Sequence, residues 1–140
     1  MGAKKKNEII ISNLDHHRLT ELIDNLEATS GQEISASLLQ LREELGRAKI
    51  TRTDKIPANV ITMNSRFRIR DMDSGQEFTY TLAWPEDADI ENNKISILAP
   101  VGTGLLGYRV GNTVEWPVPA GVRKFKIEEI LYQPEANHQT

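Results

Sequence analysis

The sequence predicts an α+β protein: a short N-terminal antiparallel helical hairpin, or coiled coil, followed by an antiparallel β-sheet domain with one short helix. Two observations predict this class. Apolar residues recur at every third or fourth position in the first third of the chain, but at every second position from about residue 50 onward. Turn-forming residues divide the alternating part into short strands. The 140 residues are enough for one domain with an appendage.

The first helix is predicted to begin after Ser12. A serine at this position can accept a hydrogen bond from a free N–H group of the first helical turn, and the acidic residue Asp15 follows three positions later. The next apolar residues have helical spacing and form a single stripe: Leu19, Leu22, Ile23 and Leu26. The run Thr29-Ser30-Gly31 ends the pattern.

A second helix is predicted from an apolar run that is typical of the seam between two packed helices. Its members alternate spacings of four and three residues: Ile34, Leu38, Leu41, Leu45 and Ala48. Because the connection to the first helix is short, the two helices are expected to lie antiparallel as neighbours. Residues 1–49 are therefore expected to hold a short N-terminal strand or arm and this helical hairpin.

A β-hairpin is predicted over residues 66–84. Arginines alternate with apolar residues in its first strand, and a turn-forming run separates that strand from a second one, which ends at Pro85. The arginines share one face: Arg66, Arg68 and Arg70. They form either a basic patch for an acidic partner or a solvent-exposed face that pairs with Glu77 across the hairpin.

Three further strands are predicted over residues 94–99, 113–118 and 122–132. In the last strand two apolar pairs have opposite parity, and a β-bulge at Glu128-Glu129 would bring all four residues into the core: Phe125, Ile127, Ile130 and Tyr132. The sheet domain is thus expected to span residues 50–133, with a flexible tail over residues 134–140.

Composition and charge narrow the classes of function. The formal net charge is −3 and the chain has no cysteine. A near-neutral balance disfavours autonomous binding of nucleic acid, and the lack of cysteine excludes disulfides and thiolate chemistry. No run has the roughly 18 apolar residues of a membrane span, and no signal peptide is recognised. We therefore expect a cytoplasmic protein with no membrane partner.

Motifs that would carry catalysis are weak. Residues 102–107 match the dinucleotide pattern G-x-G-x-x-G, but a strand begins at about Thr113, and a crossover helix needs about a dozen residues. A short helix over residues 102–106, packing Leu105 and Leu106 on the sheet, is the better interpretation. His16 and His17 are adjacent and cannot chelate a metal as an i, i+4 pair would. The residues favour a binding module without a cofactor or metal, and not an enzyme.

Several segments in a specific order resemble the C-terminal domain of the GreA/GreB transcription elongation factors. They are the run Ala99-Pro100-Val101-Gly102, the run Gly104-Leu105-Leu106-Gly107, and the run Ile127 to Tyr132. Two further segments, Val60 to Arg66 and Tyr132 to Ala136, resemble a shortened branch of the same family, the regulators of nucleoside diphosphate kinase (Rnk).

This resemblance implies an FKBP-like sheet domain, a short coiled coil and a partner, the bacterial DNA-directed RNA polymerase. In the family, the C-terminal domain sits at the rim of the polymerase secondary channel, and acidic residues at the coiled-coil tip help to hold a catalytic magnesium ion. The implied polymerase-binding residues here are Ala99, Pro100, Val101, Gly102, Leu105 and Leu106. Where Gre factors commonly have a Ser-Pro pair, this chain has Ala99-Pro100.

The hairpin departs from the Gre pattern. It is far shorter, and its tip, residues 28–32, has no carboxylate; Glu27 and Glu33 only flank it. We therefore expect a polymerase-binding regulator that does not stimulate transcript cleavage and that competes with Gre factors. Two alternatives remain open: an FKBP-like prolyl isomerase, suggested by fold analogy, and a cleavage factor that uses Glu27 and Glu33.

Overall fold

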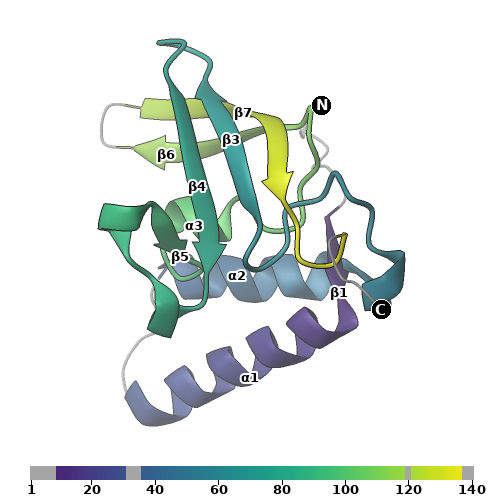
Figure 1. Ribbon diagram of the computed structural model, residues 1–140. Coiled ribbons are helices and arrows are strands. Elements are labelled where there is room, and N and C mark those ends of the chain that lie inside the picture. Colours follow the sequence, from purple (N-terminus) through teal and green to yellow (C-terminus); the bar gives the residue numbers. More distant parts are fainter. Residues whose placement is uncertain (1–8, 31–35, 119–120, 137–140) are drawn as a thin grey trace, which may run out of the picture.

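The computed structural model describes residues 9–30, 36–118 and 121–136. In chain order, two helices come before all strands of the main sheet (Figure 1). The longer elements in chain order are β1 (Ile10–Ser12), α1 (Asn13–Ser30), α2 (Ala36–Arg47), β2 (Lys49–Thr51), β3 (Arg66–Asp71), β4 (Glu77–Ala83), β5 (Lys94–Ser96), α3 (Pro100–Thr103), β6 (Thr113–Val118) and β7 (Gly121–Tyr132). Short 3₁₀ turns occur at η1 (Thr53–Lys55), η2 (Pro85–Asp87) and η3 (Ile90–Asn92).

The main sheet has five strands in the order β5-β4-β3-β7-β6. The pairs β3–β4, β3–β7 and β6–β7 are antiparallel, as the alternating pattern predicts, but β4 and β5 are parallel. The sheet is therefore mixed: most of its pairs are antiparallel, as predicted, and the parallel pairing of β4 with β5 was not expected. The chain turns back through η2 and η3 before β5, so the new strand runs in the same direction as β4.

A second, two-stranded sheet lies where the first helix begins and the second helix ends. β1 and β2 lie parallel, with Ile11 opposite Ile50, and they join the start of α1 to the end of α2. The backbone N–H of Ile10 also donates to the carbonyl of Gly107, at 3.1 Å, which ties this small sheet to the main domain. The sequence indicated an N-terminal strand but not its partner, since three residues are too few to show a period.

α1 and α2 pack on the sheet domain as well as on each other, and they lie across one end of the sheet in Figure 1. The N–H of Asp15 donates to Ser12 Oγ at 3.1 Å, which confirms the predicted helix cap. One hydrophobic core joins both helices to the sheet through buried side chains that include Leu19, Ile23, Leu38, Leu41, Leu45, Phe67, Ile69, Leu82 and Ile127. This arrangement differs from a free-standing coiled coil that projects from a domain.

The last strand confirms the predicted bulge and adds a second one. The register of β7 against β3 shifts beside Glu128 and again beside Leu131. Phe125 and Ile127 are buried and Ile130 is half-buried, but Tyr132 is 46% exposed. The prediction that Tyr132 joins the core is therefore wrong, because the second bulge resets its direction.

Candidate functional site

The candidate polymerase-binding segment is the turn that carries α3. Thr103 Oγ1 donates to the carbonyl of Ile97 at 2.6 Å, and the N–H of Leu98 donates to Ser96 Oγ at 3.0 Å. A Cβ atom at Gly102 would lie 2.3 Å from the carbonyl oxygen of Ser96, so only glycine allows α3 to approach β5 this closely. The segment is therefore held by hydrogen bonds between its side chains and its backbone, and by the close approach at Gly102.

The six residues implied by the family resemblance do not all reach the surface. Leu105 and Leu106 are 0% and 2% exposed and belong to the core, and Gly102 is also buried. Ala99 and Val101 are half-buried and present part of their side chains to solvent. A partner that binds here can touch Ala99 and Val101, whereas the two leucines fix the position of the turn.

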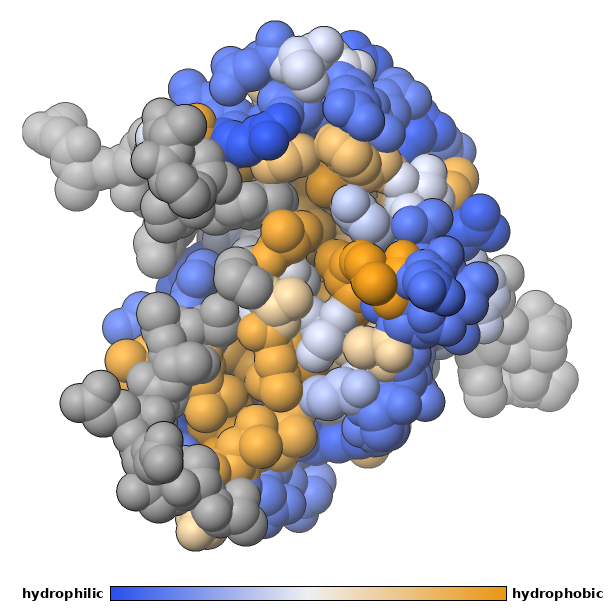
Figure 2. Space-filling model, turned by 90° about the vertical axis from the view of Figure 1, so that its left-hand side faces the viewer, coloured by the Kyte–Doolittle hydropathy of each residue, from blue (hydrophilic) through white to orange (hydrophobic). Residues whose placement is uncertain are grey.

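The surroundings of α3 are apolar. α3 packs against α2, where Leu39 is 48% exposed, and Leu98 is half-buried. Figure 2 shows hydrophobic surface gathered over the lower half of this side of the molecule, below a strongly hydrophilic upper part. Exposed apolar surface of this kind commonly marks a site of protein–protein contact.

The hairpin tip offers little for a metal ion. Glu27 forms an ion pair with Arg42 of α2, and its side chain is only 27% exposed. Glu33, the other flanking carboxylate, lies outside the described residues. Among the described residues, no group of three or more histidine or acidic side chains could hold a metal ion.

The arginines of β3 are largely neutralised by neighbouring carboxylates. Arg68 lies 2.6 Å from Glu129 and 3.6 Å from Glu77, and Arg70 lies 3.2 Å from Glu128 and 3.5 Å from the same Glu77. Arg66 is exposed. Pairing across the strands, the second interpretation given above, accounts for this row better than a free basic patch does.

Sequence reasoning missed two arginines whose contacts fasten the helices to the sheet domain. The Arg18 guanidinium of α1 lies 3.9 Å from the ring centre of the buried Trp84, and it forms an ion pair with Glu86 of η2 at 2.7 Å. Arg47 of α2 donates to the Tyr108 hydroxyl at 2.9 Å. The partners are more than 60 residues apart in the chain, so no local pattern indicates them.

The Asp15 carboxyl group, in the first turn of α1, has a raised pKa. Burial raises the pKa of Asp15 to about 6, and the nearby Glu135 adds to this rise. Glu135 accepts a hydrogen bond from Thr62 Oγ1 at 2.7 Å, and the preceding Gln133 donates to the carbonyls of Pro57 and Val60. Part of the segment predicted as a tail therefore contacts the linker between β2 and β3.

A small hollow of about 200 Å³ lies between the two helices. Its lining mixes polar and apolar side chains: His16, Thr20, Ile23, Asp24, Arg42, Leu45 and Gly46. Its basic residue Arg42 is already paired with Glu27, and His16 lies 3.1 Å from the Leu45 carbonyl. None of the helices in the described part of the chain is both long and apolar enough to cross a membrane.

Comparisons with known proteins agree on one family. Residues 56–132 match the sequence model of the C-terminal part of the transcription elongation factors GreA and GreB, and residues 7–50 match that of the Rnk N-terminus. The regulator of nucleoside diphosphate kinase of Escherichia coli K12 is 38% identical over 129 residues, which cover 91% of this chain and 92% of that protein.

Two further proteins of this family match a large part of the chain. The transcription elongation factor GreA of Clostridium botulinum (strain Langeland) is 34% identical over 97 residues, which cover 69% of this chain and 61% of that protein. A solved structure of a GreA/GreB transcription elongation factor from Nitrosomonas europaea superposes with a TM-score of 0.72 at 41% identity, over 91% of this chain and all of that one. These comparisons give no support to the prolyl isomerase alternative, and several aromatic residues that such a site would need are in the core: Phe67, Trp84, Tyr108 and Phe125.

Proposed function

Because the chain belongs to the GreA/GreB family of transcription elongation factors, we propose that it binds bacterial RNA polymerase and regulates transcription at the rim of the secondary channel. The turn around Ala99 and Val101 contacts the rim, and the helical pair covers part of the channel entrance. Effects on nucleoside diphosphate kinase, which the name of the E. coli relative suggests, then follow indirectly from transcription.

The proposed regulator does not stimulate transcript cleavage. The observation that carries this step is the ion pair between Glu27 and Arg42, which occupies the described carboxylate nearest the tip. Coordination of Mg²⁺ needs oxygen ligands about 2.1 Å from the ion, and the Arg42 guanidinium competes with the ion for the Glu27 carboxylate. Packing of both helices on the sheet domain also shortens the reach of the tip.

Competition with GreA for RNA polymerase tests the proposal. We expect the protein to displace labelled GreA from core polymerase and to reduce GreA-stimulated cleavage of RNA in a backtracked complex. Alone, it should release no short RNA from that complex. Failure to bind core polymerase, or no effect of excess protein on GreA-stimulated cleavage, would contradict the proposal.

A genuine cleavage factor is the second candidate, because Glu27 and Glu33 flank the tip. If the protein alone releases short RNAs, and if the double variant Glu27→Ala, Glu33→Ala abolishes this release while polymerase binding persists, the second candidate replaces the first. The single variant Arg42→Ala sharpens the test, since it frees Glu27 without removing a carboxylate.

A further inference from the structure

The inner face of the main sheet extends beyond the part that α3 covers. In β4 the residues Phe78, Tyr80 and Leu82 share this face, since side chains alternate along a strand. Leu82 is fully buried, and a Cβ atom at Gly102 of α3 would lie 3.1 Å from its Cδ1 atom. Phe78 and Tyr80 are only half-buried, although they face the same way.

The two aromatic rings form a stacked pair. Their centres are 6.0 Å apart with an angle of 6° between the planes, and Phe78 also packs against Phe125 at 6.3 Å. This contact fixes both rings in place on a partly exposed surface. Ordered, half-exposed aromatic side chains provide much of the binding energy in protein interfaces, because little conformational entropy is lost when a partner covers them.

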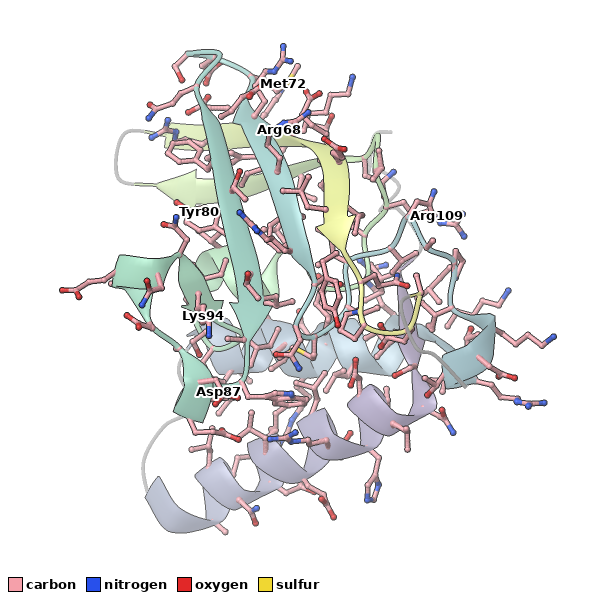
Figure 3. All side chains as sticks on the ribbon, in the orientation of Figure 1. Arg68, Met72, Tyr80, Asp87, Lys94 and Arg109 are labelled. Atoms are coloured by element: carbon pink, nitrogen blue, oxygen red, sulfur yellow. The ribbon has the colours of Figure 1, made fainter. Side chains whose placement is uncertain are left out.

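An acidic border runs beside this aromatic surface. Thr81 pairs with Lys94, so the η3 turn that precedes Lys94 lies level with Tyr80 at the sheet edge. Asp87 of η2 lies further along, past the end of β4 and nearer to α1 than Tyr80 is (Figure 3). η3 holds Glu91 and the 67% exposed Ile90, and η2 holds the exposed Asp87.

Negative charge predominates along this border. Four carboxylates lie within residues 86–91, whereas the described cations beside them are Lys94 and Arg18, the second of which is paired with Glu86. The border is therefore apolar at Ile90 and negative at Asp87 and Glu91. A phosphate backbone would be repelled by it, so nucleic acid does not fit this surface.

We propose that Phe78, Tyr80 and Ile90, with Asp87 and Glu91 along one side, extend the docking surface beyond α3. The occupant is a segment of RNA polymerase whose centre is apolar and whose flank toward η2 and η3 carries lysine or arginine. This inference rests on the proposed function and adds the chemistry of the partner. Charge complementarity is the argument for it, since opposite charges at the edge of an interface speed and orient docking.

The rate of association with core polymerase, measured as a function of salt, tests the inference. In the double variant Asp87→Lys, Glu91→Lys the association rate should fall about tenfold at low salt and should lose most of its salt dependence. The control is the pair of single variants Asp73→Lys and Asp54→Lys, which reverse exposed carboxylates in the β3–β4 turn and in η1. These controls should stay within about twofold of the wild type.

The aromatic part of the surface is tested by dissociation. Tyr80→Ala should raise the dissociation rate about tenfold with little change in association, since apolar contacts form after the encounter. The variant Thr79→Ala, on the opposite face of the same strand, should leave the rate unchanged. Thermal unfolding of each variant shows that a change in rate does not come from unfolding.

The failures of the two proposals can be told apart. A wild-type protein that does not bind polymerase overturns the proposed function and this inference together. A wild-type protein that binds, with the charge-reversed double variant equal to the controls, overturns this inference and leaves the proposed function in place. Self-association of the free protein that Tyr80→Ala abolishes would also overturn it, because the surface would then be occupied by a second copy.

Discussion

Gly102 is the residue on which the α3 turn depends most. Replacing it with alanine would bring a methyl group within 2.3 Å of the Ser96 carbonyl oxygen and 3.1 Å of Leu82, and neither the backbone nor the buried leucine can move freely. We expect Gly102→Ala to reduce the free energy of unfolding by about 1–3 kcal/mol and to weaken polymerase binding.

Gly46 provides the matched control for this substitution. A Cβ atom there meets nothing within 4 Å, and the residue lies within α2, where alanine is the better helix former. Gly46→Ala should leave stability unchanged or increase it by about 0.5–1 kcal/mol in urea unfolding. Equal destabilisation by both substitutions would contradict the close approach of α3 to β5.

Asp15 is expected to make stability depend on pH. The pKa of this carboxyl is about 6 in the folded protein and 3.8 unfolded, so the folded state holds the proton more tightly. The stabilisation from the protonated form is complete below about pH 4 and is lost as the pH rises through about 6. The wild type should therefore lose stability between pH 4 and pH 7, whereas Asp15→Asn should not. The free energy of unfolding of the variant relative to the wild type should rise by about 1–2 kcal/mol over this range, as measured by urea unfolding at several pH values.

Glu135 supplies a check on this explanation. Glu135→Gln removes the like charge near Asp15 and keeps an oxygen that can accept the hydrogen bond from Thr62. Part of the pH dependence should disappear in this variant, and the rest, which burial causes, should stay. A pH dependence unaffected by either substitution would show that other groups cause it.

Helix α1 is fastened to the sheet domain in its first half by Arg18. The stacking on Trp84 and the ion pair with Glu86 should together contribute about 1 kcal/mol, because the ring is buried and the ion pair is exposed. Arg18→Ala should reduce stability by that amount and should increase amide hydrogen exchange along α1. Arg52→Ala, which removes only the exposed pair with Asp54, should change neither quantity measurably.

The helices and the β-hairpin were predicted correctly where apolar residues recur at regular spacing over a long segment. The cap at Ser12, the apolar stripe of the first helix and the strands around residues 66–84 all match the structure. Short segments were harder. Residues 97–99 leave the strand after only three paired residues, and β2 has no period to detect, because contacts with distant parts of the chain decide such segments.

Burial of Leu105 and Leu106 confirms the prediction that they pack on the sheet, while Ala99 and Val101 are half-buried. The role of the α3 turn in binding a partner comes from the family resemblance and stays a prediction. Pairing of the β3 arginines with Glu77 was one of the two interpretations offered by the sequence. Pairing of Glu27 with Arg42, and of the β3 arginines with Glu128 and Glu129, depends on which strands and helices are neighbours. Sequence spacing does not contain that information.

The molecule as a whole should unfold in one step, since its helices and its sheet share one core. Leu41 of α2 is fully buried, and Leu41→Ala should reduce the free energy of unfolding by about 2–5 kcal/mol. Circular dichroism, which follows the helices, and tryptophan fluorescence, which follows Trp84 and the sheet, should give the same unfolding midpoint in the wild type and in the variant. Separate midpoints would contradict the shared core.

The sequence by itself determined the α+β class, the order of helices and strands, the family and the shortness of the hairpin. Those properties follow from local periodicity and from the order of short motifs along the chain. Only the tertiary structure decided that the helices pack on the sheet, that Glu27 pairs with Arg42, and that Phe78 and Tyr80 stay half-buried at the edge of the core. These depend on contacts between residues far apart in sequence, and burial and charge pairing arise only when the chain brings them together.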